Sequence, residues 1–230
     1  MRWFVTGDKH GDWRPIYRWI DRMDFNSEDI AIIILGDAGI CWRKDKTDML
    51  SVINYHERYY KTHIYFIDGN HENFDVLKSL PIAEDGLAHL SEHIHYIPRG
   101  FVGFLDFGDH ACKVVTCGGA DSVDRFRRTK HLNWWEDEAI TQENIDKIGT
   151  GATTYVLTHC CPYSVFQEFA PYLITLTGIN QDKVDHTSEK MLDQLSQNMT
   201  FDKWFFGHYH IDMKLNDKYT CLLHSFIELE

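Results

Sequence analysis

Five short polar clusters along the chain contain side chains of the types that bind metal ions. They are Gly7-Asp8-Lys9-His10-Gly11, Gly36-Asp37-Ala38-Gly39, Gly69-Asn70-His71-Glu72, Thr158-His159 and Gly207-His208-Tyr209-His210. Zinc, manganese and iron accept such mixtures of carboxylate, amide and imidazole ligands. In an extended loop Asp8 and His10 point to the same side because one residue separates them, and the same holds for His208 and His210. The clusters therefore predict a metal-dependent enzyme.

Each cluster taken alone also has a purely structural explanation. An isolated Asp-x-His is typical of a turn beside a surface histidine, and Asp37 fits a turn in which a carboxylate caps backbone amides. The residues after Asn70 fit a strand-to-helix junction with Asn73 as the helix N-cap, and His159 fits a buried core histidine. A carboxylate has two oxygens, however, so Asp37 can bridge two ions that lie ~3.5–4 Å apart.

Apolar segments precede most of the clusters and predict the strands that position them. These segments cover residues 2–6, 30–35, 63–67, 113–117, 154–158 and 204–206. Several are almost continuously apolar, which is typical of strands buried on both faces of a sheet. Helical spacing predicts helices at 15–23, 46–60 and 73–80. The order strand, helix, strand favours a parallel sheet in the first third of the chain, with the clusters at the carboxyl ends of its strands.

The pattern changes after Ile94 to shorter strands with turn signals between them. Strands are predicted at 101–107 and 112–117, helices at 141–148 and 187–198, and a hairpin from 213–215 and 219–223. This pattern predicts a second sheet that is mixed or antiparallel. Segments 119–135 and 162–185 are expected to be loops that determine the choice of substrate.

Length, charge and cysteine content limit the class of protein. The 230 residues fit a single domain spanning 1–230, large enough for a substantial core. A net charge of −12 argues against an extended basic surface for nucleic acid, although bound dications would still attract a phosphate group. Six cysteines without paired CxxC spacing predict reduced thiols in a cytoplasmic protein. We expect no signal peptide and no membrane span, since no apolar run approaches ~20 residues.

The ordered motifs resemble those of the calcineurin-like metallophosphoesterase superfamily. They are Asp8-x-His10, Gly36-Asp37, Gly69-Asn70-His71-Glu72, His159 and Gly207-His208-x-His210. The resemblance implies a four-layer α/β/β/α sandwich of two mixed sheets flanked by helices, with a dinuclear metal centre at the sheet edge. The implied ligands are Asp8, His10 and His210 for the first metal, Asn70, His159 and His208 for the second, and Asp37 as the bridge.

The resemblance also implies hydrolysis of a phosphate ester. A water molecule shared by two dications loses a proton near neutral pH, and the resulting hydroxide attacks phosphorus in line. His71, which the resemblance does not assign to a metal, is expected to protonate or stabilise the leaving oxygen. Asn70 is also expected to contact the phosphate. Manganese is the first expectation for the two divalent ions, with iron or zinc as alternatives.

One position departs from the family pattern. The pattern Gly-Asp-x-x-Asp would place an aspartate at position 40, where this chain has Ile40. In the Ser/Thr protein phosphatase branch that aspartate supports the catalytic histidine and an arginine follows it to bind phosphate; both are absent here. The departure disfavours protein dephosphorylation and leaves open what polarises His71. The terminal Gly-His-x-His resembles the phosphodiesterase and nuclease branches, which favours phosphodiester substrates.

The segment 118–136 resembles an insert in small bacterial and phage members. Arg125 and Arg128 within it are expected to bind the substrate phosphate, with a solvated charged loop as the alternative. Trp134 and Trp135 fit either stacking on a base or packing in the core.

Three alternatives to phosphodiester hydrolysis follow from the same motifs. The first is a phosphomonoesterase or protein phosphatase, and the second is a nuclease that engages a single-stranded end without a basic groove. The third is a non-catalytic scaffold that keeps the fold. Scaffold members tend to lose the catalytic histidine, whereas His71 is present here.

Overall fold

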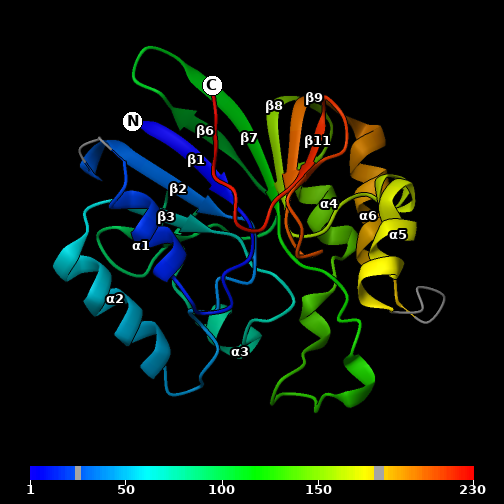
Figure 1. Ribbon diagram of the computed structural model, residues 1–230, viewed down its shortest axis with the longest axis horizontal. Coiled ribbons are helices and arrows are strands. Elements are labelled where there is room, and N and C mark those ends of the chain that lie inside the picture. The colour runs from blue at the N-terminus through cyan, green and yellow to red at the C-terminus, as the bar shows by residue number, and fades with distance from the viewer. Residues whose placement is uncertain (24–26, 179–183) are drawn as a thin grey trace.

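Two six-stranded β-sheets form the centre of the molecule (Figure 1). The computed structural model describes residues 1–23, 27–178 and 184–230. The first sheet contains β1 (Arg2–Thr6), β2 (Ile30–Ile34), β3 (His63–Phe66), β4 (Ala88–His89), β5 (Ile94–Tyr96) and β12 (Ile227–Glu228). The second contains β6 (Phe101–Asp106), β7 (Ala111–Cys117), β8 (Gly151–Thr158), β9 (Met199–Phe206), β10 (Met213–Lys214) and β11 (Tyr219–Cys221).

Both sheets have the same plan of parallel strands bordered by antiparallel edges. The strand orders are β12-β1-β2-β3-β5-β4 and β10-β11-β9-β8-β7-β6. In each sheet the four inner strands are parallel and the two edge strands are antiparallel to their neighbours. The hairpin predicted near the end of the chain is confirmed as β10 and β11. The short strands β4, β5 and β12 were not predicted, because a few residues carry no readable periodicity.

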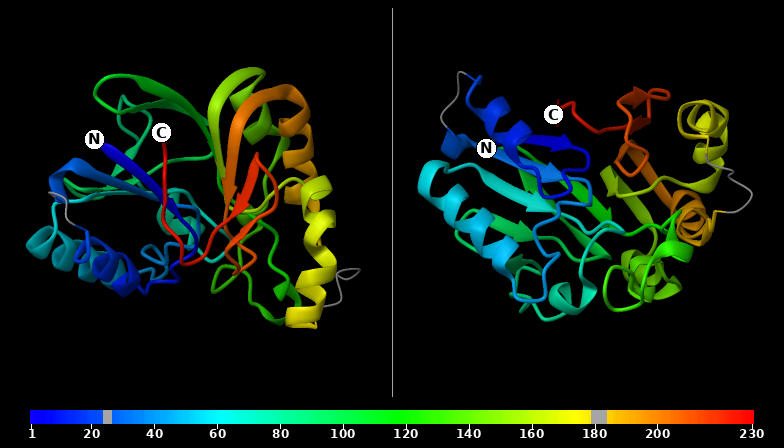
Figure 2. Two further views of the ribbon diagram at one scale, coloured as in Figure 1. Left: turned by 45° about the horizontal axis from the view of Figure 1, so that its top comes forward. Right: turned by 60° about the horizontal axis from the view of Figure 1, so that its bottom comes forward.

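Helices cover the outer face of each sheet and complete four layers (Figure 2). The first sheet is covered by α1 (Arg14–Ile20), α2 (Thr47–Tyr59) and α3 (Phe74–Leu77). The second is covered by α4 (Gln142–Ile148), α5 (Tyr163–Thr177) and α6 (Thr187–Asn198). Short 3-10 helices are η1 (Ser27–Asp29), η2 (Arg125–Arg127) and η3 (Glu136–Glu138). The α/β/β/α sandwich expected from the resemblance is confirmed.

The layered arrangement explains the continuous apolar character of the central strands. All five residues of β2 are buried. Ile32 belongs to the buried cluster that contains Ile16 of α1, whereas its neighbour Ile33 belongs to the cluster between the sheets that contains Leu157 of β8. Alternate side chains of a strand point to opposite faces, so a strand covered on both faces must be apolar at every position.

The prediction that 162–185 is a loop was wrong for residues 163–177, which form α5. Pro171 lies inside this helix and, because proline lacks an N–H and disfavours helix interiors, it conceals the helix in the sequence. In the fold, Phe166, Phe169 and Leu173 bury one side of α5 against the second sheet, and this packing offsets the cost of the proline. Residues 179–183 of the same segment lie outside the described residues.

A buried ion pair joins Asp68, which follows β3, to Arg99, which precedes β6 and also contacts the end of η3. Arg99 Nε donates to Asp68 Oδ2 at 2.6 Å, and the other guanidinium nitrogens donate to the carbonyl oxygens of Ala139 and Glu138. The Asp68 side chain is fully buried. We expect Arg99→Leu to lower the free energy of unfolding by about 3–5 kcal/mol, because the carboxylate would stay buried without its partner. Urea unfolding followed by circular dichroism measures this change.

The matched control is Arg14→Leu, which breaks the solvent-exposed ion pair between Arg14 and Asp12. Exposed pairs contribute little because water screens the charges. The unfolding midpoint should therefore shift far less than in Arg99→Leu, and equal shifts would contradict the role given to the buried pair.

Candidate metal centre

The predicted ligands converge on one rim of the sandwich. Asp8 and His10 follow β1, Asp37 follows β2 and Asn70 follows β3, while His159 and the His208 cluster follow β8 and β9 of the second sheet. These strands are parallel within each sheet, so their carboxyl ends lie at the same edge. Five separate loops therefore deliver the clusters to one place, as the sequence predicted.

One group of possible ligand atoms consists of Asp8, His10 and His210. The Nε2 atoms of His10 and His210 lie 3.0 Å apart, and His210 Nε2 lies 3.3 Å from Asp8 Oδ2. Asp8 is buried, whereas both histidines are exposed. The three side chains therefore surround one point at the surface of the rim.

A second group consists of Asp8, Asp37 and His159, all of them buried. His159 Nε2 lies 3.5 Å from Asp37 Oδ2 and 3.1 Å from Asn70 Oδ1, and the ring centre of His208 is 5.0 Å from that of His159. Asp37 Oδ2 also lies 3.8 Å from His10 Nδ1. The carboxylate of Asp37 thus faces both groups, which is the position expected of a bridge. Asp8 belongs to both groups as well.

Backbone conformation holds several of these side chains in place. His10, Asp37, His208 and His210 have φ values of 46°, 47°, 67° and 54°. The left-handed region costs a non-glycine residue about 1–3 kcal/mol, and such strain concentrates at functional sites where the surrounding structure enforces it. The four residues therefore occupy turns shaped for the site rather than relaxed loops.

Close backbone approach explains two of the glycines that precede the ligands. A Cβ atom on Gly207 would lie 2.2 Å from Asp8 Oδ1, and one on Gly69 would lie 2.0 Å from Asp37 Oδ1. Each glycine lets the next loop reach a carboxylate of another loop. His208 N donates to Asp8 Oδ1 at 2.9 Å, and His71 N donates to Asp37 Oδ1 at 2.8 Å.

The electrostatics of the rim fit divalent cations. Asp8 and Asp37 are buried together, and Asp8 Oδ2 accepts no hydrogen bond. Burial opposes a charge on His159, but the carboxylates of Asp37 and Asp8 outweigh it and raise the pKa of His159 to about 9. Burial and the neighbouring His159 lower the pKa of His208 to about 3. His208 is therefore a neutral imidazole, and the two buried carboxylates attract positive charge, which His159 carries as a proton that a metal ion would displace. This donor set fits divalent metal ions.

Residues that the motifs do not contain orient the predicted ligands. His159 Nδ1 lies 2.8 Å from the Leu35 carbonyl oxygen, which directs Nε2 toward Asp37. Asn70 Nδ2 donates to Ser122 Oγ at 3.0 Å, which directs its amide oxygen toward His159, and Ser122 Oγ donates to Glu138. Such outer hydrogen bonds orient metal ligands. Sequence reasoning missed Ser122 and Glu138 because they lie 52 or more residues from Asn70 and match no motif.

The structural explanation predicted for the Asn70 cluster, with Asn73 as a helix N-cap, is confirmed. Asn73 caps α3, since its side-chain oxygen accepts hydrogen bonds from the backbone N–H groups of Asp75 and Val76. The cap fixes the start of the helix directly after the loop that carries Asn70 and His71. One short segment therefore both begins a helix and places Asn70 and His71 at the rim.

A family model described as calcineurin-like phosphoesterase matches residues 1–212. This span includes every residue of the rim. The chain belongs to the calcineurin-like phosphoesterase family. It is therefore a metal-dependent phosphoesterase, a hydrolase whose substrate is a phosphate ester, and the family implies a centre of two divalent ions. The comparison with curated proteins gave no match. Within the described ranges, no helix has both the length and the apolar character needed to cross a membrane.

In this calcineurin-like phosphoesterase, the polar side chain that contacts the ring of His71 among the described residues is an arginine and not a carboxylate. Arg128 Nη2 lies 2.9 Å from His71 Nε2. Burial, and after it the Arg128 charge, lower the pKa of His71, although Asp37 opposes this shift. Ile40 stands at the position of the family aspartate. It is fully buried in the hydrophobic core between the first sheet and its helices. The side chain at position 40 is therefore part of the core and offers His71 no polar partner.

The two arginines predicted to bind substrate have different surroundings. Asp124 and the Asn133 carbonyl oxygen hold the guanidinium of Arg128, so it stays beside His71. The guanidinium of Arg125 lies over the ring of Trp134, 4.2 Å from its centre, and does not contact His71. Trp134 and Trp135 are themselves buried. Of the two uses predicted for this pair, stacking on a base and packing in the core, burial fits packing in the core.

Proposed function

We propose that this phosphoesterase hydrolyses phosphodiesters with two divalent ions, for which manganese is the first candidate and iron and zinc are alternatives. The observation that supports the two-ion proposal best is the position of Asp37. Its Oδ2 lies 3.8 Å from His10 Nδ1 and 3.5 Å from His159 Nε2. A carboxylate between two sets of ligands is suited to bridging.

The proposed roles follow from the donor groups. Asp8, His10 and His210 would hold one ion, Asn70, His159 and His208 the other, and Asp37 both. When bound, two such ions lower the pKa of a water molecule and neutralise charge on the phosphate oxygens. Asn70 would contact the phosphate, and Arg128 would donate to it from beside His71. Arg128 Nη2 lies 2.9 Å from His71 Nε2 and 3.3 Å from Nδ1, and the His71 ring would support the leaving oxygen.

Two features support a diester rather than a monoester. The aspartate that supports the histidine in the protein phosphatase branch is replaced by the buried Ile40. A cavity of about 250 Å³ also opens directly from the rim and is lined by His71, His208 and His210. A monoester presents one organic group, whereas a diester has a second substituent that needs such a space.

Metal-free protein resupplied with Mn²⁺ should hydrolyse bis-p-nitrophenyl phosphate with a higher kcat/KM than p-nitrophenyl phosphate. Metal content measured in parallel should approach two ions per chain. Absence of turnover with each of Mn²⁺, Fe²⁺, Zn²⁺ and Co²⁺ would refute the proposed function, and a preference for the monoester would refute the diester assignment.

Arg128 offers a test of phosphate binding. We expect Arg128→Met to lower kcat/KM for bis-p-nitrophenyl phosphate by about 10- to 100-fold, since a charge-assisted hydrogen bond contributes about 1.5–3 kcal/mol. Arg127→Met is the matched control, because Arg127 is exposed in the same segment and lies over the Phe126 ring. Arg125→Met tests the remaining prediction for Arg125. An Arg128→Met enzyme as active as Arg127→Met would exclude the proposed contact.

A further inference from the structure

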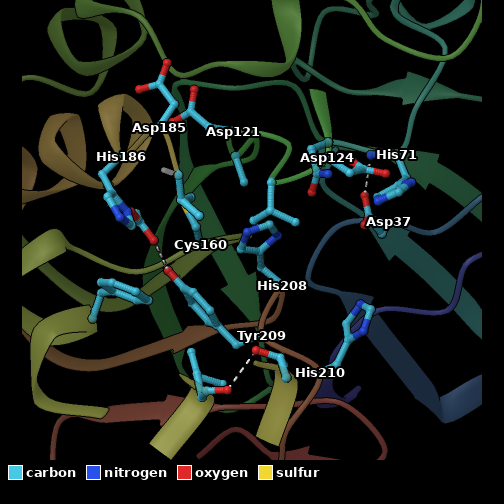
Figure 3. A pocket seen from close by; sticks show the side chains of 18 residues that line it. Asp37, His71, Asp121, Asp124, Cys160, Asp185, His186, His208, Tyr209 and His210 are labelled. Carbon is cyan, nitrogen blue, oxygen red and sulfur yellow. Dashed lines mark hydrogen bonds and ion pairs between the residues drawn. The ribbon is translucent and has the colours of Figure 1, made fainter. Parts of the chain in front are cut away.

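The cavity at the rim continues away from the candidate metal centre into the space beside α5 and α6 (Figure 3). Asp37, His71 and His210 line the end of the cavity at the candidate metal centre. Figure 3 shows Asp121 and Asp185 on the opposite side of the same pocket. The volume of about 250 Å³ lies below the range of about 300–1,000 Å³ typical of drug-sized ligands. It therefore suits one small organic group and not a length of polymer.

Aromatic and aliphatic side chains form the middle of this pocket. Phe166 and Leu173 of α5 and Tyr209 line it. Tyr209 is fixed because its hydroxyl donates to Glu189 Oε1 at 2.6 Å and its ring packs on Phe169, 5.0 Å between centres. Rigid aromatic walls favour a flat or apolar occupant, because such a group gains from burial and stacking without ordering the walls.

The charged side chains of the lining beyond the metal centre all have the same sign. They are Asp121, Asp185 and Glu189, and among the described lining residues none is lysine or arginine. Asp124 lies beside His71, where it pairs with Arg128, and Glu189 also contacts His186. Burial raises the pKa of Asp121, and the negative charges of Asp185 and Glu189 raise it further, although the amide of Ser188 opposes the shift. The carboxylates thus repel one another across the pocket. A positively charged occupant would relieve this repulsion and a negatively charged one would increase it.

We propose that this pocket binds the substituent of the phosphodiester that is not released, and that it selects a small, flat or apolar group of zero or positive charge. The inference rests on the proposed function, because it assigns the second substituent of that same reaction. Aromatic rings and quaternary amines both fit the aromatic wall, since cations are attracted to ring faces. The carboxylates of Asp121, Asp185 and Glu189 disfavour a substituent that carries a further phosphate or carboxylate. The small volume of the pocket disfavours a long polynucleotide.

Three diesters with p-nitrophenol as the common leaving group test the charge preference. Their second substituents are choline, which is cationic, 3,3-dimethylbutyl, its neutral isostere, and 2-carboxyethyl, which is anionic. In Mn²⁺ at low ionic strength we expect kcat/KM to fall in that order, with the choline ester about tenfold or more above the carboxyethyl ester. Added salt should reduce this ratio. A carboxyethyl ester that equals or exceeds the choline ester would overturn the proposal.

A single carboxylate then connects the preference to the pocket. Asp185→Asn removes one of these carboxylate charges but keeps a side-chain oxygen that can accept from Thr187 N, as Asp185 Oδ1 does at 3.1 Å. The choline-to-carboxyethyl ratio should fall several-fold. Asp193→Asn is the matched control, since Asp193 lies on α6 outside the pocket lining and accepts a hydrogen bond from Ser164 N. The choline-to-carboxyethyl ratio of this variant should match that of the wild type.

The outcomes separate this inference from the proposed function. Turnover of all three esters with equal kcat/KM, or an Asp185→Asn ratio equal to that of Asp193→Asn, overturns the pocket assignment and leaves phosphodiester hydrolysis standing. Turnover of none of them with any of the four metals overturns both.

Discussion

Replacing Asp37 with asparagine should lower kcat/KM for bis-p-nitrophenyl phosphate by about 1,000-fold or more, because one bridging carboxylate acts on both proposed ions and each ion contributes several kcal/mol to transition-state stabilisation. The substitution keeps the shape of the side chain. Asparagine Oδ1 can still accept from His71 N, as Asp37 Oδ1 does at 2.8 Å. The charge that faces His10 and His159 is lost, so the loss of activity would report on the charge and not on loop structure.

Metal content and activity should be measured together. Asp37→Asn is expected to hold fewer than two ions per chain after dialysis, because its neutral amide has a single oxygen ligand. Asp12→Asn is the control, since Asp12 is a partly exposed aspartate on the same loop as His10 and pairs with Arg14. An Asp37→Asn protein with two bound ions and the activity of Asp12→Asn would rule out the bridging role.

Replacing His71 with glutamine should lower kcat about 100- to 10,000-fold for a diester with an alkoxide leaving group, which is the range for loss of an acid–base group. The effect should be much smaller for a p-nitrophenyl ester, because p-nitrophenolate leaves with little protonation. Bound metal should stay unchanged, since the His71 ring is not among the grouped ligand atoms and its centre is 5.1 Å from that of His10. Paired assays of the two leaving groups measure the difference.

The control for His71→Gln is His110→Gln, which alters an exposed histidine paired with Asp109. Its kinetics should match the wild type with both esters. Equal losses for alkoxide and p-nitrophenol substrates, or a loss of bound metal in His71→Gln, would show that His71 acts on the structure of the site and not on the leaving group.

The sequence alone determined the rim because local pattern and topology agree there. Almost continuous apolar character marks β1, β2 and β3 as buried strands, and parallel strands bring the residues that follow them to one edge. The positions of Asp8, Asp37 and Asn70 therefore follow from strand ends that are readable one segment at a time. The same local reading failed at α5, because Pro171 opposes a helix and only packing of the apolar face against the second sheet overrides it.

Tertiary structure alone decided what surrounds the ligands. Both Arg125 and Arg128 precede Trp134 in one charged segment, and nothing in their spacing distinguishes them. Asp124 and the Asn133 carbonyl oxygen direct Arg128 to His71, while Arg125 stacks on Trp134. The Ser122 and Glu138 support of Asn70 and the acidic pocket beside α5 arise in the same way. Such contacts join residues far apart in sequence through irregular loops, where side-chain direction depends on the fold and has no period to read.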